Sequence, residues 1–502
     1  MNEQRGQWGS RLGFILAAIG SAVGLGNIWR FPYTASSNGG GAFLIPYLFA
    51  LLTAGIPILI LEFAIAHKIK KSVPGVFGSV KNGLQSLGWI QTFVSISITV
   101  YYTVIIGWSM NYAFYALSSK WGTDTSGFFF GEFLNITDSP FNIGHINKGM
   151  LLALAAVWLI NYFVLSSGIK AGIEKANKIF MPLLVACLVI VAIRGITLEG
   201  AVQGLDYFFK PEFSKLSDPT VWLAAYGQIF YSLSICFGIM ITYASYLPEK
   251  TDIVNNAFMT GLGNCSFSIL AGMTVFSVLG YMAAQQGVSV AEVSAGGIGL
   301  AFIVFPKAIN ALPGMNGTFG AIFFLCLIFA GLSSSMSIIE VIVSSIQGKF
   351  DIARKKVLRY IIVIGFLISL IFVTGAGLYI LDIVDHFVNT YAIALAGLVE
   401  ILVLAYMVDL EELRSYANGM SDFAIGKWWI YTLKYLTPAL LAIMFVFNTY
   451  VDFTKGYEGY SLKALMVYGV GTLVFIVVGA LVFNRIKGED EKNNQISRGD
   501  AV

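Results

Sequence analysis

The chain has 502 residues, of which 57% are hydrophobic and only 12% are charged, and its mean hydropathy is +0.76. A soluble domain carries about twice that share of charge, so the composition excludes an ordinary soluble protein and indicates a membrane protein. The net charge of +3 gives no support to a nucleic-acid partner.

Apolar segments long enough to cross a bilayer recur along the whole chain. They lie at about 11–37, 41–67, 86–117, 149–167, 178–197, 221–247, 255–284, 317–347, 357–376, 380–407, 430–450 and 464–484. The pattern predicts an all-α membrane protein of roughly twelve transmembrane helices in one domain over 11–484. Of the 31 Lys and Arg residues, 22 fall on one side of this arrangement. The positive-inside rule therefore predicts cytoplasmic termini at 1–10 and 485–502.

The first and sixth segments differ from the rest because glycine and serine interrupt them. The first contains Gly20-Ser21-Ala22-Val23-Gly24-Leu25-Gly26-Asn27, and the sixth contains Gly227-Gln228-Ile229-Phe230-Tyr231-Ser232-Leu233-Ser234. An alternative explanation is helix packing, because small residues let membrane helices approach closely. However, the two segments occupy corresponding positions if five spans repeat as five. The pattern then predicts inverted repeats over about 11–197 and 221–407, with two further helices at 430–450 and 464–484.

An unwound turn inside the membrane would give these segments their chemistry. Free N–H groups at the start of a half-helix favour a carboxylate, and free carbonyl groups favour a cation. Sodium prefers oxygen ligands, by the same reasoning as calcium. Arg30 follows the first break and needs an acidic partner or water. Asp385, at the start of the tenth span, is the candidate partner.

Several motifs resemble one family of transporters. They are Arg5 with Trp8, GSAVGLGNIWRFPY at 20–33, NGGGAF at 38–43, VWLAAYGQIFYSLSICFG at 221–238, ITYASY at 241–246 and FAGLSSSMSIIE at 329–340. Together they resemble the neurotransmitter:sodium symporter family, in particular its bacterial leucine transporter type. The resemblance covers nearly all of the first ten spans. It implies a sodium-coupled symporter that works by alternating access, with unwound first and sixth helices.

The resemblance also implies a set of binding residues. The substrate would be bound by Ser21, Ala22, Leu25, Gly26, Ile98, Tyr102, Tyr231, Ser232, Ser234, Phe237, Ser334 and Ile338. One sodium site would use Ala22, Asn27, Ser232 and Asn264, and a second would use Gly20, Val23, Ala330, Ser333 and Ser334. The outer gate would be Arg30 with Asp385, and the inner gate would involve Arg5, Trp8 and Tyr246.

Gly24 bears on the class of substrate. Monoamine transporters resemble this motif but have an aspartate at that position, which supplies the carboxylate that their substrates lack. The glycine therefore favours a substrate with its own carboxylate, and the apolar pocket favours a neutral, hydrophobic or aliphatic amino acid. A GABA-like molecule or compatible solute remains an alternative, as does a non-transporting sensor of the same fold. No nucleophile–base pair or metal cluster indicates an enzyme.

Ser268 in the seventh span predicts a chloride requirement. Chloride-independent leucine-type members have an acidic residue there, whereas chloride-dependent animal members have serine. Two sodium ions in a low dielectric need a compensating anion. Tyr47, Gln228, Ser232 and Ser268 would bind chloride, although a serine in a membrane helix is often a packing residue.

Three further expectations concern single positions. The acid expected in the inner gate is replaced by Gly348, and Asp351 is a candidate substitute. Glu62 is expected to tether the unwound turns from the second span. The four cysteines lie in apolar segments and are expected to be buried without metal-ligand spacing. Short outer segments without cysteine suggest a bacterial inner membrane.

Overall fold

A computed structural model describes residues 6–486 and 488. The secondary structure of these residues consists of helices, without a β-sheet. Within this range ten continuous helical segments are long and apolar enough to span a membrane, and one bent pair adds an eleventh. The predicted all-α membrane fold is confirmed. The sixth predicted span is absent from that set because its break leaves two helices too short to span alone.

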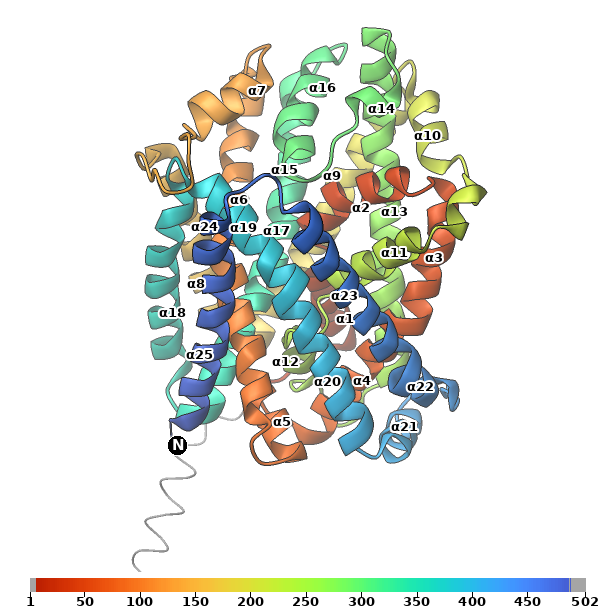
Figure 1. Ribbon diagram of the computed structural model, residues 1–502, viewed down its shortest axis with the longest axis vertical. Coiled ribbons are helices and arrows are strands. Elements are labelled where there is room, and N and C mark those ends of the chain that lie inside the picture. The colour runs from red at the N-terminus through yellow and green to blue at the C-terminus, as the bar shows by residue number, and fades with distance from the viewer. Residues whose placement is uncertain (1–5, 487, 489–502) are drawn as a thin grey trace, which may run out of the picture.

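The helices of the continuous spans follow the predicted order (Figure 1). They are α3 (Leu44–Ala50) with α4 (Ile56–Ile69), α6 (Gln85–Ser118), α8 (Lys148–Ser166), α9 (Lys175–Ile196), α13 (Ile253–Gln286), α17 (Asn316–Phe350), α18 (Arg354–Ser369), α19 (Gly377–Phe387) with α20 (Ala394–Met407), α22 (Trp428–Tyr431) with α23 (Thr437–Lys455), and α24 (Leu462–Ala464) with α25 (Gly471–Arg485). Shorter helices connect them: α5 (Val73–Val80), α7 (Thr125–Gly127), α10 (Ala201–Phe209), α14 (Val290–Val293), α15 (Gly297–Gly299), α16 (Phe305–Ala311) and α21 (Leu410–Gly419).

Two spans are interrupted. The first consists of α1 (Arg11–Ala22) and α2 (Leu25–Ser37), which meet at an angle of 55°. The sixth consists of α11 (Pro219–Ser232) and α12 (Ile239–Ala244), with residues 233–238 between them. In that connection Ser234 and Cys236 have φ of 54° and 67°, a left-handed conformation that is rare outside glycine. Such a backbone is tolerated only where its surroundings hold it in place.

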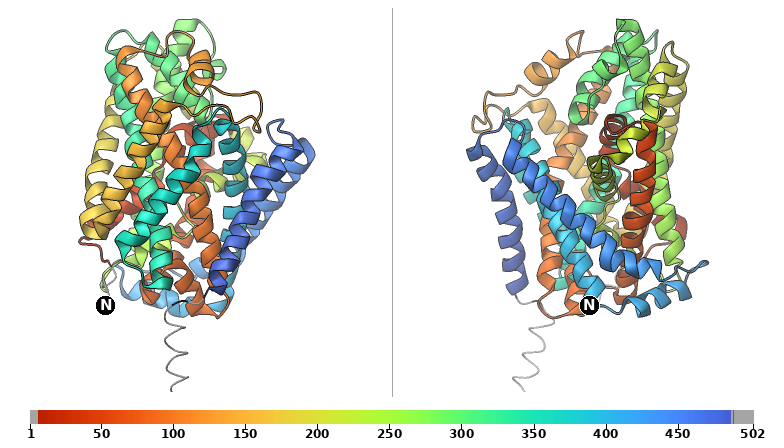
Figure 2. Two further views of the ribbon diagram at one scale, coloured as in Figure 1. Left: turned by 90° about the vertical axis from the view of Figure 1, so that its left-hand side faces the viewer. Right: turned by 45° about the vertical axis from the view of Figure 1, so that its right-hand side comes forward.

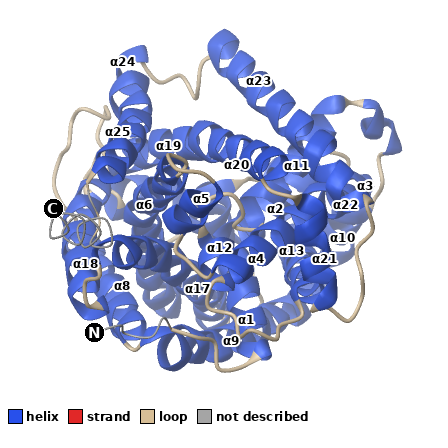
Figure 3. Cartoon of the chain, turned by 90° about the horizontal axis from the view of Figure 1, so that it is seen from below, coloured by secondary structure: helices blue, strands red, loops and turns tan. Residues whose placement is uncertain are grey.

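The interrupted spans lie in the interior of the bundle. Seen from below, α12 is surrounded by neighbours that include α4 and α17 (Figure 3). The spans that contain α6 and α17 are mostly enclosed, whereas those that contain α23 and α25 are mostly exposed. Figure 2 shows these last two helices at the edge of the bundle. In a membrane the exposed apolar side chains of α25 would face lipid, so the broken helices are shielded from the bilayer by a ring of intact ones.

Candidate functional site

The end of α1 is held by hydroxyl groups from two other spans. Ser234 Oγ donates to the carbonyl oxygen of Ser21 at 2.9 Å, and Ser334 Oγ donates to the same oxygen at 3.2 Å. The helix ends at Ala22 because Val23 and Gly24 leave the α conformation. Carbonyl groups at a helix end lack partners inside the helix. Here the break of the sixth span and α17 both converge on them.

The start of α2 faces two tyrosines. The backbone N–H of Leu25 points to the Tyr102 hydroxyl at 3.4 Å. Gly26 approaches the other ring so closely that an added Cβ would lie 2.3 Å from Tyr231 Cε1. A Cβ on Gly24 would lie 3.2 Å from the Tyr102 hydroxyl oxygen. The N-terminal end of a helix with free N–H groups is a site for an anion such as a carboxylate.

A chain of buried amides and hydroxyls connects α2, α11 and α13. Asn27 Nδ2 donates to Asn264 Oδ1 and to Ser268 Oγ, each at 2.8 Å. Asn264 Nδ2 donates to Ser232 Oγ at 3.0 Å. Three residues of the first expected sodium site, Asn27, Ser232 and Asn264, therefore lie together, and Asn27 also caps the break by accepting from the N–H of Gly24. Their oxygen atoms suit a hard cation.

Two of the residues expected to bind chloride, Ser268 and Ser232, are the two ends of this chain. Tyr47 OH donates to Ser268 Oγ at 3.4 Å. Gln228 is 1% exposed, and its side-chain N and O atoms have no hydrogen-bond partner among the described residues. A buried amide without partners costs about 1–3 kcal/mol. An anion that accepts from Gln228 would remove part of that cost.

The second expected sodium site lies between α1 and α17. Ser334 Oγ contacts the Gly20 carbonyl oxygen at 3.4 Å, and Ser333 Oγ donates to the Ala330 carbonyl at 2.9 Å. Val23, at the end of α1, is fully buried. The structure thus brings oxygen atoms of α1 and α17 together beside the break.

The side chains expected to surround a substrate form an apolar wall. Ile98, Phe237 and Ile338 are each less than 8% exposed. Tyr102 and Tyr231 are half-buried and lie against Gly24 and Gly26 of the break. None of these five side chains is charged at neutral pH. The wall suits an uncharged, apolar side chain.

The two residues of the expected outer gate do not form a direct ion pair. The Arg30 guanidinium lies over the Tyr231 ring, 4.4 Å from its centroid, and Arg30 is exposed. Asp385 instead accepts from Tyr101 OH at 2.7 Å and from Asn389 Nδ2 at 2.8 Å. The cation–π contact places the arginine directly above one of the site tyrosines.

At the expected inner gate, the structure contains a buried acid that was not predicted from the sequence. Trp8 donates through Nε1 to the Tyr243 carbonyl at 2.8 Å, and Tyr246 OH donates to Glu340 Oε1 at 2.8 Å. Glu340 is fully buried and forms a bidentate ion pair with Arg354. Nη2 is 2.5 Å from Oε2, and Nη1 is 2.9 Å from Oε1. Arg5 lies outside the described residues. A lone acid at the end of the FAGLSSSMSIIE motif was the signal that could have indicated Glu340.

A second ion pair lies near the start of α1. Arg11 Nη2 is 3.2 Å from Asp252 Oδ2, and Arg11 Nε donates to Asn256. Burial opposes ionisation of Asp252, but hydrogen bonds from the backbone N–H groups of Asn255 and Asp422 hold its pKa below the usual value. The carboxylate is therefore charged at neutral pH and fixes the first helix to the start of α13.

Glu62 contacts the break of the sixth span. Its Oε1 accepts from the backbone N–H of Cys236 at 2.7 Å. Cys236 is one of the residues with positive φ and lies outside any helix, so its N–H group has no carbonyl acceptor within a helix. The Glu62 carboxylate is the acceptor instead. This contact agrees with the expected tethering position of Glu62.

Comparisons with known proteins point to one family. The profile of the Sodium:neurotransmitter symporter family matches residues 5–125 and 118–486. An uncharacterized sodium-dependent transporter of Methanocaldococcus jannaschii is 43% identical over 484 residues, covering 96% of this chain and 98% of the relative. The human sodium- and chloride-dependent GABA transporter 2 is 30% identical over 486 residues, covering 89% of this chain and 80% of the relative.

A solved structure has the same fold. The crystal structure of MhsT in complex with L-phenylalanine matches with a TM-score of 0.75 and 34% sequence identity. The match covers 88% of this chain and 99% of that one. The likeness therefore extends through almost all of the bundle.

Proposed function

Because this chain belongs to the sodium:neurotransmitter symporter family, we propose that it imports a neutral, hydrophobic or aliphatic amino acid together with sodium. One observation carries the proposal: the N–H groups at the start of α2 and the carbonyl groups at the end of α1 meet at a single break. A substrate carboxylate would contact Leu25, Gly26 and Tyr102, while cations would contact the carbonyl side.

Two sodium ions have separate ligands in this proposal. The first would be bound by Asn27, Ser232 and Asn264 with the Ala22 carbonyl, after rearrangement of their present hydrogen bonds. The second would be bound between α1 and α17. Since the first ion would also contact the substrate carboxylate, each would strengthen the binding of the other, which couples their movement. Alternating access would expose the break to each side in turn.

The nature of the substrate is inferred from the pocket. Gly24 offers no carboxylate for an amine, and the wall of Ile98, Phe237 and Ile338 offers no partner for a charged side chain. A relative whose structure contains L-phenylalanine supports this choice. The GABA transporter among the relatives keeps a GABA-like substrate as the second candidate, since it too carries a carboxylate. A sensor of the same fold would bind but not accumulate its ligand.

The test is uptake by purified protein in proteoliposomes, with a panel of radiolabelled amino acids and GABA. We expect accumulation of neutral apolar amino acids that depends on an inward sodium gradient. Binding without accumulation would favour the sensor. Accumulation of GABA in preference to every α-amino acid would reject the proposed substrate class.

Chloride is proposed as a third ion, bound near Tyr47, Gln228 and Ser268. Replacement of chloride by gluconate is expected to lower uptake, because two sodium ions would then lack a compensating charge. Ser268→Glu should restore uptake in gluconate by supplying a fixed negative charge. Ser277→Glu, which puts the same charge elsewhere on α13, serves as control. Full wild-type uptake in gluconate would contradict the chloride site.

The location follows from the same proposal. The protein would lie in the plasma membrane, as in a bacterial inner membrane, with residues 1–10 and 485–502 in the cytoplasm. The excess of Lys and Arg on that side supports this orientation. Protease protection of a C-terminal tag in intact cells, and its loss after permeabilisation, would test it.

A further inference from the structure

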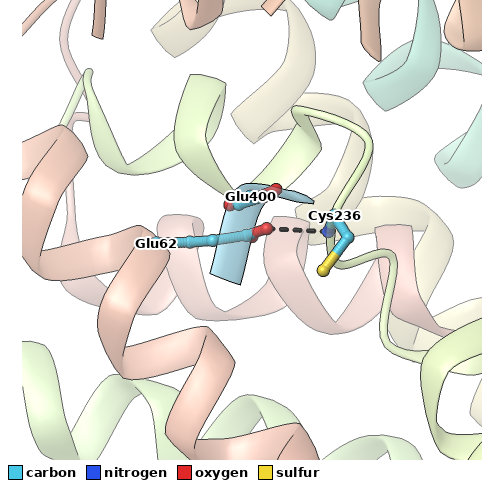
Figure 4. Close-up of side chains that lie close together, drawn as sticks. All are labelled: Glu62, Cys236 and Glu400. Carbon is cyan, nitrogen blue, oxygen red and sulfur yellow. Dashed lines mark hydrogen bonds between the residues drawn. The ribbon is translucent and has the colours of Figure 1, made fainter. Parts of the chain in front are cut away.

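Three fully buried side chains meet beside the break of the sixth span. Glu62 comes from α4, Cys236 from the connection between α11 and α12, and Glu400 from α20 (Figure 4). One ligand atom from each lies within 4.8 Å of the others, and all three residues are 0% exposed. They join three spans that are far apart in the sequence.

The hydrogen bonds in this cluster leave several oxygen atoms without a donor. Glu62 Oε1 accepts from the N–H of Cys236, and Glu400 Oε2 accepts from Gln91 Nε2 at 2.5 Å. Gln91 Oε1 is buried without a hydrogen-bond partner among the described residues, and the second oxygens of Glu62 and Glu400 can pair only with each other, through a shared proton. Two adjacent carboxylates in a low dielectric cannot both stay ionised unless a positive charge lies between them.

The thiol lies on the same side as the second carboxylate. An added Cβ on Gly397 would lie 2.9 Å from Cys236 Cβ and 3.1 Å from its Sγ. Gly397 therefore makes room for the thiol on α20, about one helical turn before Glu400. The positive φ of Cys236 directs this side chain, so the backbone of the break itself places a sulfur ligand next to the carboxylates.

We infer that Glu62, Cys236 and Glu400 form a binding site for a thiophilic divalent cation of the zinc class. A thiolate with carboxylate oxygens is a ligand set for such an ion, whereas sodium does not favour sulfur. Gln91 Oε1 is available as a fourth ligand. On binding, the thiol releases its proton, and so does the carboxyl pair if it holds one. None of these four residues belongs to the proposed substrate or sodium sites.

A bound ion would connect α4, the break and α20. The break must rearrange for the substrate site to open and close, so an ion that links it to two other spans should slow transport. This makes the cluster an inhibitory site. Its occupancy can be measured on purified protein without any transport, so failure of this inference is distinguishable from failure of the proposed function.

The binding test uses Cd²⁺ as a spectroscopic substitute for Zn²⁺. Wild-type protein should show cadmium–thiolate absorption in the ultraviolet and bind one ion by mass analysis after desalting. Cys236→Ser and Cys236→Gly should each weaken Zn²⁺ binding at least about tenfold. Glycine suits the positive φ, so the second variant should fold. Cys326→Ser, a buried cysteine on α17, is the matched control and should bind as wild type.

The transport test compares uptake with and without Zn²⁺ in each variant. Inhibition should occur in wild type and Cys326→Ser and be lost in Cys236→Gly, when each variant is compared with its own uptake rate in the absence of Zn²⁺. Equal Zn²⁺ binding by wild type and Cys236→Gly would overturn the inference. So would the absence of any cadmium–thiolate band, which would mean that the carboxyl pair holds only a proton.

Discussion

Gly26→Ala is expected to abolish most sodium-dependent uptake while leaving the protein folded. The new Cβ would lie 2.3 Å from Tyr231 Cε1, so either α2 or the ring must move. Overpacking of this kind costs about 1–3 kcal/mol, which corresponds to about 5- to 150-fold weaker binding. Both groups that move belong to the proposed substrate site. The loss should therefore appear as a higher substrate Kd.

Gly227→Ala provides the matched control for this substitution. Gly227 belongs to the other broken span, yet an added Cβ there would meet only Met444 Cε at 3.5 Å, an ordinary contact. It should transport as wild type. Scintillation-proximity binding on purified protein, with size-exclusion profiles to verify folding, measures both variants. Wild-type affinity in Gly26→Ala would show that the N-terminal end of α2 does not bind the substrate.

Among the substitutions proposed for this protein, Glu340→Ala is expected to lower the free energy of unfolding the most. It leaves Arg354, whose side chain is 17% exposed, without the carboxylate that it contacts through two nitrogens, and it removes the acceptor of Tyr246 OH. Removal of one partner from a buried ion pair costs about 3–5 kcal/mol. Because Tyr246 follows α12 and Arg354 begins α18, the inner end of the bundle should also open more readily. Uptake should fall with stability.

The surface ion pair between Lys68 and Glu412 allows a direct comparison. Its nitrogen and oxygen are 2.6 Å apart, but the side chains are 37% and 67% exposed. Exposed pairs contribute only about 0–1 kcal/mol. Glu412→Ala should therefore leave the thermal unfolding midpoint in detergent almost unchanged. If Glu340→Ala unfolds at the same temperature as Glu412→Ala, the buried network has no structural role.

Much of this protein could be predicted from local patterns. Hydropathy located the spans because an apolar environment requires about 20 apolar residues per crossing. Glycine and serine indicated the breaks because they weaken a helix wherever they cluster. Asn27, Ser232 and Asn264 lie together in the structure, and their role in binding sodium stays a prediction.

The partners of the buried acids were decided only by the tertiary structure. Glu340 is visible in the sequence as a lone acid in an apolar span. Nothing in the local sequence indicates that its partner is Arg354, and the acid of the inner gate was expected near Gly348 instead. Glu62 and Glu400 lie 338 positions apart, and no periodicity connects them. A polar group in a low dielectric must find a partner. Which partner it finds depends on how distant helices pack, and the sequence pattern of a single helix does not contain that information.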